Sequence, residues 1–364
     1  MTAQDRNEFG LPSDGGGRDL GIFLPIGNGG WILSSTTPVI DGSYDYNRRA
    51  AEIAEEIGLD FIMSMAKWRG YGGATRHWHS TLDSQVLMSA LAARTKRVKI
   101  WTTVHTLLQN PAVTAKMIAT LDQVSHGRAG LNVVTGAYRD EFAQMGAWPE
   151  DVGHDERYDL ATEWIRIVKR LWREDSVTES GRFFCMQDCQ SEPKPVQVPR
   201  PFIVSAGMSE RGMAFAVAEN DGLFVGGRDD EELAACSRRA KRLAREAGRR
   251  IRTYAMLILV IEDSDRAAAA TLDRFRAGFD EEAFRGMLRS YGMIDAEIGH
   301  ENSFTARARS GLMAPHAAGS PATIAARMEA LFERCDLDGM MLIFPDYPTG
   351  LRRLGDEILP RLGR

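Results

Sequence analysis

The chain has 364 residues, 44% hydrophobic and 26% charged, which is enough for one large barrel or two medium domains. Its formal net charge of −5 offers no positive field to a phosphate backbone or an anionic lipid surface. We therefore expect a small-molecule ligand, with no nucleic acid and no membrane as partner. No secretion signal is recognisable at the N-terminus, so we expect a cytoplasmic protein.

Residues 1–18 are polar, lack periodicity and contain three consecutive glycines, which predicts a flexible arm before a single domain over 19–364. Eight short apolar runs follow, at 21–27, 60–66, 97–104, 129–136, 201–207, 221–227, 253–263 and 338–347. They alternate with amphipathic helical patterns such as 45–58 and 156–172. Runs that are apolar on both faces are typical of parallel strands covered by helices, and eight of them predict a closed (β/α)8 barrel, the TIM-barrel fold.

Three connections are too long for simple turns: 67–80, 176–200 and 265–320. The first and third follow strands, so we place them at the active face of the barrel. The second precedes a strand and predicts a decorating hairpin, packed down by its two phenylalanines and by Cys185 and Cys189.

Cysteine and histidine spacing predicts no metal site. Four cysteines are too sparse for a disulfide framework, which favours reduced thiols. His77 and His79 flank Trp78 in the first long loop, where a general-acid role and a structural role are both open. The glycine-rich segment 69–73 lacks the Lys and Ser/Thr of a P-loop and is interpreted as a flexible lid.

Polar residues end four of the predicted strands, in the segments 64–67, 102–105, 132–136 and 205–209. Each alone is typical of a turn or cap, but four together indicate hydrogen-bonding groups over the barrel mouth. Asn132 lies inside an apolar strand, where its amide needs partners. It faces either a polar heterocycle or a neighbouring strand.

An anion site is predicted where two helices begin. Ser209 is an expected N-cap, and the helix start after it suits a phosphate as well. Arg157 and Tyr158 open another helix and offer a guanidinium fork and a hydroxyl. The alternative for Arg157 is a surface salt bridge with Asp155 or Glu156.

At these residues the chain resembles the bacterial luciferase-like flavin monooxygenases, and most closely their pyrimidine oxygenase and dimethylsulfone monooxygenase branches. The matching stretches are 22–31, 64–73, 119–136, 141–149, 154–160, 206–215 and 338–347. They are spread over nearly the whole chain from residue 20 onward.

The resemblance implies an enzyme that binds FMN as FMNH2. The residues implied at the isoalloxazine ring are Ala66, Lys67, Asn132 and Glu141. Those implied at the FMN phosphate are Arg157, Tyr158 and Ser209.

The resemblance also implies the reaction. A separate NAD(P)H-dependent flavin reductase supplies FMNH2, O2 adds to form a flavin peroxide, and the peroxide oxidises and cleaves a small, uracil-like amide. Thr103 matches a threonine near the oxygen pocket, so Thr103, Asn132 and Glu141 are the expected catalytic residues. A homodimer or homotetramer is expected from the same family.

One position departs from both branches. Both carry a tryptophan directly after the glycine that ends the fourth apolar run, whereas here Gly136 is followed by Ala137. This removes a flat surface from the pocket and keeps a sulfone or a carbon–halogen centre open as targets. Two other functions also remain open: hydride transfer with the deazaflavin F420, and non-catalytic flavin binding.

Overall fold

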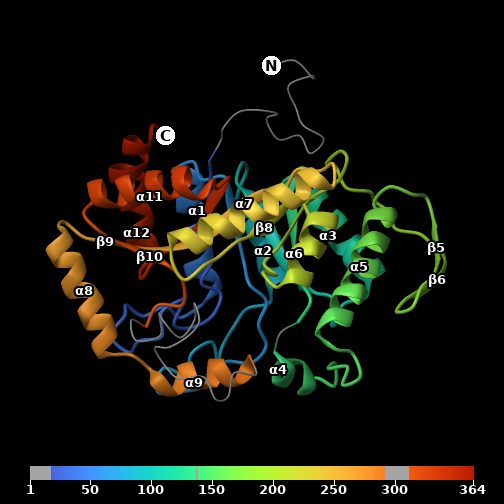
Figure 1. The fold of residues 1–364 in the computed structure, drawn as a ribbon, viewed down its shortest axis with the longest axis horizontal. Helices are drawn as coiled ribbons and strands as arrows, with labels where there is room; N and C mark the ends of the chain where they lie inside the picture. Colours follow the sequence, from blue (N-terminus) through green and yellow to red (C-terminus); the bar gives the residue numbers. More distant parts are fainter. Residues whose placement is uncertain (1–17, 137, 292–310) are drawn as a thin grey trace.

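The computed structural model describes residues 18–136, 138–291 and 311–364. Its central feature is a closed barrel of parallel strands, in which β8 pairs with β9 to complete the circle (Figure 1). The strands are β1 (Asp19–Phe23), β2 (Phe61–Met63), β3 (Lys99–His105), β4 (Ala129–Val134), β7 (Phe202–Ser205), β8 (Gly222–Phe224), β9 (Arg252–Ile261) and β11 (Gly339–Ile343). Each overlaps one of the eight apolar runs, so the predicted (β/α)8 barrel is confirmed.

A further strand, β10 (His316–Gly319), pairs with the last residues of β9. These residues belong to the predicted long connection 265–320, in which no strand was predicted. The sequence of β10 is only HAAG, too short and too small to stand out as an apolar run. It pairs with β9 because β9 is longer than the strands beside it.

Helices cover the outside of the barrel. They include α1 (Tyr44–Glu56), α2 (Ser84–Arg94), α3 (Pro111–Ser125), α5 (His154–Leu171), α6 (Glu210–Glu219), α7 (Asp230–Glu246) and α11 (Pro321–Cys335). The others are α4 (Arg139–Ala143), α8 (Asp265–Ala277), α9 (Glu281–Ser290), α12 (Tyr347–Arg353), the π-helical turn η2 (Leu354–Ile358) and the 3-10 turn η3 (Leu359–Leu362). The caps predicted from sequence are present, since Asn110 and Ser209 accept backbone N–H bonds at the starts of α3 and α6.

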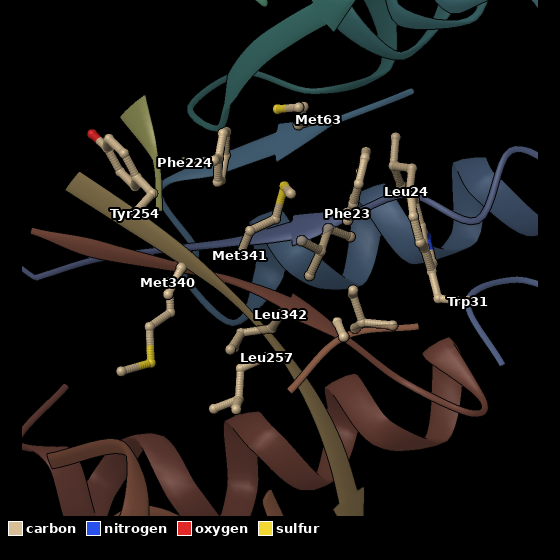
Figure 2. Packing of buried hydrophobic residues seen from close by; sticks show 14 of the residues in the cluster. Phe23, Leu24, Trp31, Met63, Phe224, Tyr254, Leu257, Met340, Met341 and Leu342 are labelled. Atoms are coloured by element: carbon tan, nitrogen blue, oxygen red, sulfur yellow. The ribbon is translucent and has the colours of Figure 1, made fainter. Parts of the chain in front are cut away.

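Aromatic rings fill the barrel interior. Phe61 stacks on Trp101 at 4.1 Å, and Trp101 stacks on Phe202 at 5.2 Å, while Tyr254 meets their edges. Glycines opposite them make the room, because a Cβ at Gly130 would lie 2.3 Å from the Trp101 ring. The apolar packing continues outward among side chains of the neighbouring strands (Figure 2). The interior is therefore a packed core, and any ligand site lies at a barrel end.

The segment before β7 forms the predicted hairpin, β5 (Val177–Ser180) paired antiparallel with β6 (Cys185–Cys189). Phe184 and Cys189 pack against the neighbouring core, as expected, but Cys185 is exposed. The expectation that both cysteines hold the hairpin down is wrong for Cys185. All four cysteines are free thiols.

The two ends of the barrel differ. In Figure 1 the C-terminus lies at one end, whereas α4 and α9 lie together at the other. The loops after β2 and β4 lead to this second end, where α4 packs against α9. The predicted arm falls outside the described residues except for Arg18, which forms an ion pair with Glu329. Within the described ranges, no helix has the length and apolar character needed to cross a bilayer.

Candidate active site

A buried ion pair lies at the end of the barrel that carries α4 and α9. The Lys67 ammonium, just after β2, lies 2.9 Å from Glu141 on α4, and the two side chains are 2% and 1% exposed. The other carboxylate oxygen accepts the backbone N–H of Trp68 at 2.5 Å. Burial lowers the pKa of Lys67, and the Glu141 carboxylate opposes that shift. The structure thus brings together two residues that the sequence analysis placed at the same site.

Two tyrosine rings face the ammonium group, and a third tyrosine contacts one of them. The Lys67 Nζ lies 4.8 Å from the centre of the Tyr71 ring and 3.9 Å from that of Tyr138, both within cation–π range. The Tyr138 and Tyr291 hydroxyls are hydrogen-bonded to each other. Burial, together with the neighbouring phenols, raises the pKa of Tyr71 and Tyr138 well above the usual value. Sequence reasoning missed all three tyrosines, although Tyr138 follows a predicted strand end closely.

Thr103 and Asn132 lie opposite each other on β3 and β4. The Asn132 amide donates to the Thr103 hydroxyl at 3.0 Å, and that hydroxyl donates to the Ser64 carbonyl. Asn132 therefore ties two strands, which was one of its two interpretations. Its Oδ1 is nonetheless buried and has no hydrogen-bond partner among the described residues. An acceptor left over in a buried site is what a polar ligand would satisfy.

The buried hydroxyls of Ser64, Ser84 and Thr102 form a hydrogen-bonded group next to Thr103. Ser84 lies 2.6 Å from the Ser64 hydroxyl and 2.9 Å from the Thr102 hydroxyl, and it accepts the Thr103 backbone N–H at 2.9 Å. Because Ser84 is the first residue of α2, these hydrogen bonds join the middle of β3 and the end of β2 to a helix start. They fix the backbone on which Thr103 is mounted.

Ala66 is held through its backbone. His105, the last residue of β3, has its Nε2 at 3.3 Å from the Ala66 carbonyl oxygen. The rings of Trp68 and Phe142 contact the imidazole edge on. Burial lowers the pKa of His105 to about 4, so the ring is neutral at pH 7 and donates to the carbonyl.

The first long loop is packed rather than open. Tyr71, His77 and Trp78 within residues 67–80 are all buried, and His79 is exposed. The segment 69–73, which we interpreted as a flexible lid, is therefore packed against the protein at its central residue, Tyr71. Burial lowers the pKa of His77 to about 3, and neither of its ring nitrogens has a hydrogen-bond partner among the described residues. His77 is a neutral packing residue, the structural alternative of the sequence analysis.

A second group of polar residues lies where α5 and α6 begin. The Tyr158 hydroxyl fits between one glycine before α6 and one in its first turn, because a Cβ would lie 2.5 Å from it at Gly207 and 2.6 Å at Gly212. Ser209 caps the helix by accepting the Gly212 backbone N–H at 3.1 Å. Tyr158 and Ser209 are therefore brought to the same helix start.

Arg157 has no carboxylate partner among the described residues. It donates to the Val152 carbonyl at 3.2 Å and lies over the Trp148 ring at 4.8 Å. The two acids expected to neutralise it are engaged elsewhere, Asp155 with His154 and Glu156 with Arg182. The surface salt bridge proposed as the alternative for Arg157 is therefore wrong.

The site as a whole contains two clusters of the expected residues. Ala66, Lys67, Thr103, Asn132 and Glu141 gather where β2, β3, β4 and α4 meet, and Arg157, Tyr158 and Ser209 gather at the starts of α5 and α6. Ala137, the departure noted in the sequence, lies outside the described residues. In the described part of the chain no three His, Cys, Asp or Glu side chains come together as a metal site requires.

Comparison with known proteins identifies the family. The model of the luciferase-like monooxygenase family matches residues 19–336. The chain belongs to this family. Its members are flavin-dependent monooxygenases, so the chain is an oxidoreductase of that type acting on a small substrate. The resemblance seen in the sequence is confirmed.

Individual relatives agree with this assignment. The pyrimidine monooxygenase RutA of Methylorubrum extorquens strain PA1 is 36% identical over 349 residues, covering 94% of this chain and 93% of RutA. A riboflavin lyase structure with modified FMN and riboflavin superposes with a TM-score of 0.84 at 23% identity, over 95% of this chain and 91% of the lyase. A long-chain alkane monooxygenase gives 0.84 at 22%, with the same coverage. At such identities the two structures support the fold alone.

Proposed function

We propose that this protein binds FMN in its reduced form and uses O2 to oxygenate and cleave a small, uracil-like amide. The observation that carries the proposal is the unpaired Arg157 next to Tyr158, whose hydroxyl enters the turn before α6. A cation without a carboxylate, a hydroxyl and a helix N-terminus together suit a phosphate. The relationship to RutA supports the same cofactor and the choice of substrate.

The residues present fit FMN at both of its ends. At the phosphate end, a side chain at Gly207 or Gly212 would displace the Tyr158 hydroxyl, so the turn is shaped around that group. At the ring end, the buried Oδ1 of Asn132 needs a donor, and a flavin ring offers N–H groups. In this proposal Arg157, Tyr158 and Ser209 bind the phosphate, while Asn132 and the Ala66 backbone bind the ring.

Bound reduced FMN would supply the electrons with which O2 is activated and one oxygen atom is passed to the substrate. The protein positions the reactants and excludes water. His105 holds the Ala66 carbonyl, and the Lys67–Glu141 pair presents a cation and a carboxylate whose charges balance. Thr103 holds the Asn132 amide in place, because its hydroxyl accepts from that amide. We assign Thr103, Asn132 and Glu141 the roles nearest the reacting atoms.

Two further components belong to this proposal. A separate NAD(P)H-dependent flavin reductase supplies the reduced FMN, as the resemblance to the flavin monooxygenases implies. The subunits pair as a homodimer or homotetramer, which stays a prediction from the family resemblance. Both can be tested directly with purified protein, by reconstitution with a reductase and by light scattering.

The first experiment measures FMN affinity. Titration of the purified protein, followed by flavin fluorescence, should show binding that falls about 10- to 100-fold in Arg157→Ala, as expected for loss of charge-assisted hydrogen bonds. Arg173→Ala is the matched control, because Arg173 is an exposed arginine near the other end of α5. Equal affinity in Arg157→Ala and the wild type would contradict the phosphate assignment.

The second experiment tests the reaction. The protein is loaded with reduced FMN under anaerobic conditions and mixed with 18O2, with and without uracil. One 18O atom in the uracil product supports the proposal. Flavin oxidation without an 18O-labelled product of uracil rejects the uracil-like substrate. A repeat with dimethylsulfone then tests the chemistry of the dimethylsulfone monooxygenase branch. In a separate assay with F420 in place of FMN, hydride transfer without oxygen consumption would reject the proposal that the protein is an oxygenase.

A further inference from the structure

Helix α9 is tied to the Lys67 loop at its start. Asp280, which caps α9, accepts both the backbone N–H and the hydroxyl of Thr75 at 2.7 Å. In its middle, Gly286 packs against the Tyr71 backbone so closely that a Cβ there would lie 1.9 Å from the Tyr71 carbonyl oxygen. Helix α9 is therefore fastened along the loop that carries Lys67.

The end of α9 is joined to a different segment. Tyr291 follows the last residue of α9 and is held there by backbone bonds to Met287 and Leu288. Its hydroxyl is hydrogen-bonded to that of Tyr138, which lies between β4 and α4, and the two ring centres are 4.6 Å apart. The same Tyr138 ring lies 3.9 Å from the Lys67 ammonium. One hydrogen bond thus connects α9, the β4–α4 loop and the buried cation.

We propose that Tyr138 and Tyr291 are positioning residues whose hydroxyl–hydroxyl hydrogen bond, called here the tyrosine clasp, holds the Lys67 ammonium against Glu141 and shields it from water. The Lys67 ammonium gives one of its three N–H groups to Glu141 and faces tyrosine rings. A cation in that setting depends on its neighbours to exclude water, and the clasp closes the side that Glu141 does not cover.

The assignment has a chemical reason. A buried ion pair is sensitive to small displacements, because water entering the site weakens its attraction. The rings of Tyr138 and Tyr71 supply cation–π contacts, whereas the Tyr291 hydroxyl fixes where the Tyr138 ring lies. The positioning role in catalysis rests on the proposed function, but the shielding of Lys67 does not.

Chemical labelling of Lys67 tests the clasp without any flavin. The purified protein is treated with acetic anhydride at limiting dose, and acetylation of each lysine is measured by mass spectrometry. In Tyr291→Phe and Tyr138→Phe, each of which keeps the ring, acetylation of Lys67 should rise about fivefold, equivalent to about 1 kcal/mol for one hydrogen bond. The double variant should be acetylated at Lys67 at least as fast as either single one, because it removes both hydroxyls of the shared bond.

Two controls separate the clasp from general loosening. Lys169, which lies near the end of α5 and pairs with Glu219 with its side chain 22% exposed, should label at the wild-type rate in every variant. Tyr44→Phe, which changes an exposed tyrosine at the start of α1, should leave Lys67 labelling unchanged. Unchanged Lys67 labelling in both clasp variants would overturn the proposal, and so would equal increases at Lys67 and Lys169.

A turnover measurement then links the clasp to the reaction. With reduced FMN, O2 and uracil, Tyr291→Phe should return more of the consumed O2 as hydrogen peroxide than the wild type does. An unchanged share of hydrogen peroxide in a variant whose Lys67 labelling has risen would overturn the catalytic positioning role. Absence of any uracil product in the wild type would instead reject the proposed substrate and leave the labelling result standing.

Discussion

Two buried neutral histidines should make the fold sensitive to mild acid. Burial lowers the pKa of His77 to about 3 and that of His105 to about 4, against about 6.5 in an unfolded chain. Between those values the unfolded state binds protons that the folded state refuses, so stability falls as pH falls below 6.5. At pH 5, which is 1.5 units below 6.5, each histidine costs about 2 kcal/mol at ~1.4 kcal/mol per unit. Together they contribute a loss of about 4 kcal/mol between pH 8 and pH 5.

Urea denaturation followed by tryptophan fluorescence at pH 8 and pH 5 measures this loss. His77→Phe keeps an aromatic ring that cannot titrate, so its pH-dependent loss should be smaller than that of the wild type by about 2 kcal/mol. His79→Phe is the matched control, because His79 is exposed two residues away and its replacement should leave the wild-type pH dependence. Equal pH dependence in His77→Phe and the wild type would refute the claim that His77 is buried in its neutral form.

Other substitutions test separate parts of the structure. Gly212→Ala should weaken FMN binding about 10-fold or more in a fluorescence titration, because its Cβ would lie 2.6 Å from the Tyr158 hydroxyl; unchanged affinity would contradict that fit. Asp122→Ala should lower the free energy of unfolding in urea by about 3 kcal/mol, because Asp122 is buried and accepts from the backbone N–H groups of Ala129 and Gln197. A loss below about 0.5 kcal/mol would mean that water replaces it. Ala137→Trp should narrow the range of accepted substrates, and identical kinetics with every compound tried would place residue 137 outside the pocket.

Much of the fold could be predicted because strands, helices and caps each leave a pattern in a short stretch of sequence. Each parallel strand is buried on both faces, so a short apolar run marks it, and the runs are separated by helices with one apolar stripe. Caps are local too, as Asn110 and Ser209 show. Strand β10 escaped prediction because its pairing depends on the length of β9, which is a tertiary property.

The candidate site was less accessible to sequence reasoning. Residue types suggested that Lys67 and Glu141 belong to one site, but only the fold brings positions 74 residues apart into an ion pair. Arg157 does not pair with Glu156, because Glu156 pairs with Arg182, which the β5–β6 hairpin places beside it. Nothing in the local sequence around Tyr291 signals that its hydroxyl meets another tyrosine 153 positions earlier in the chain.

The aromatic rings in the barrel interior determine where reactants can enter and products can leave. Because Phe61, Trp101, Phe202 and Tyr254 leave no passage along the axis, every reactant must arrive and every product must leave at one end of the barrel. A flavin bound there would lie at the same end of the barrel as the substrate. New substrate preferences can then arise by changing the loops around that end, while the stabilising rings beneath it stay untouched.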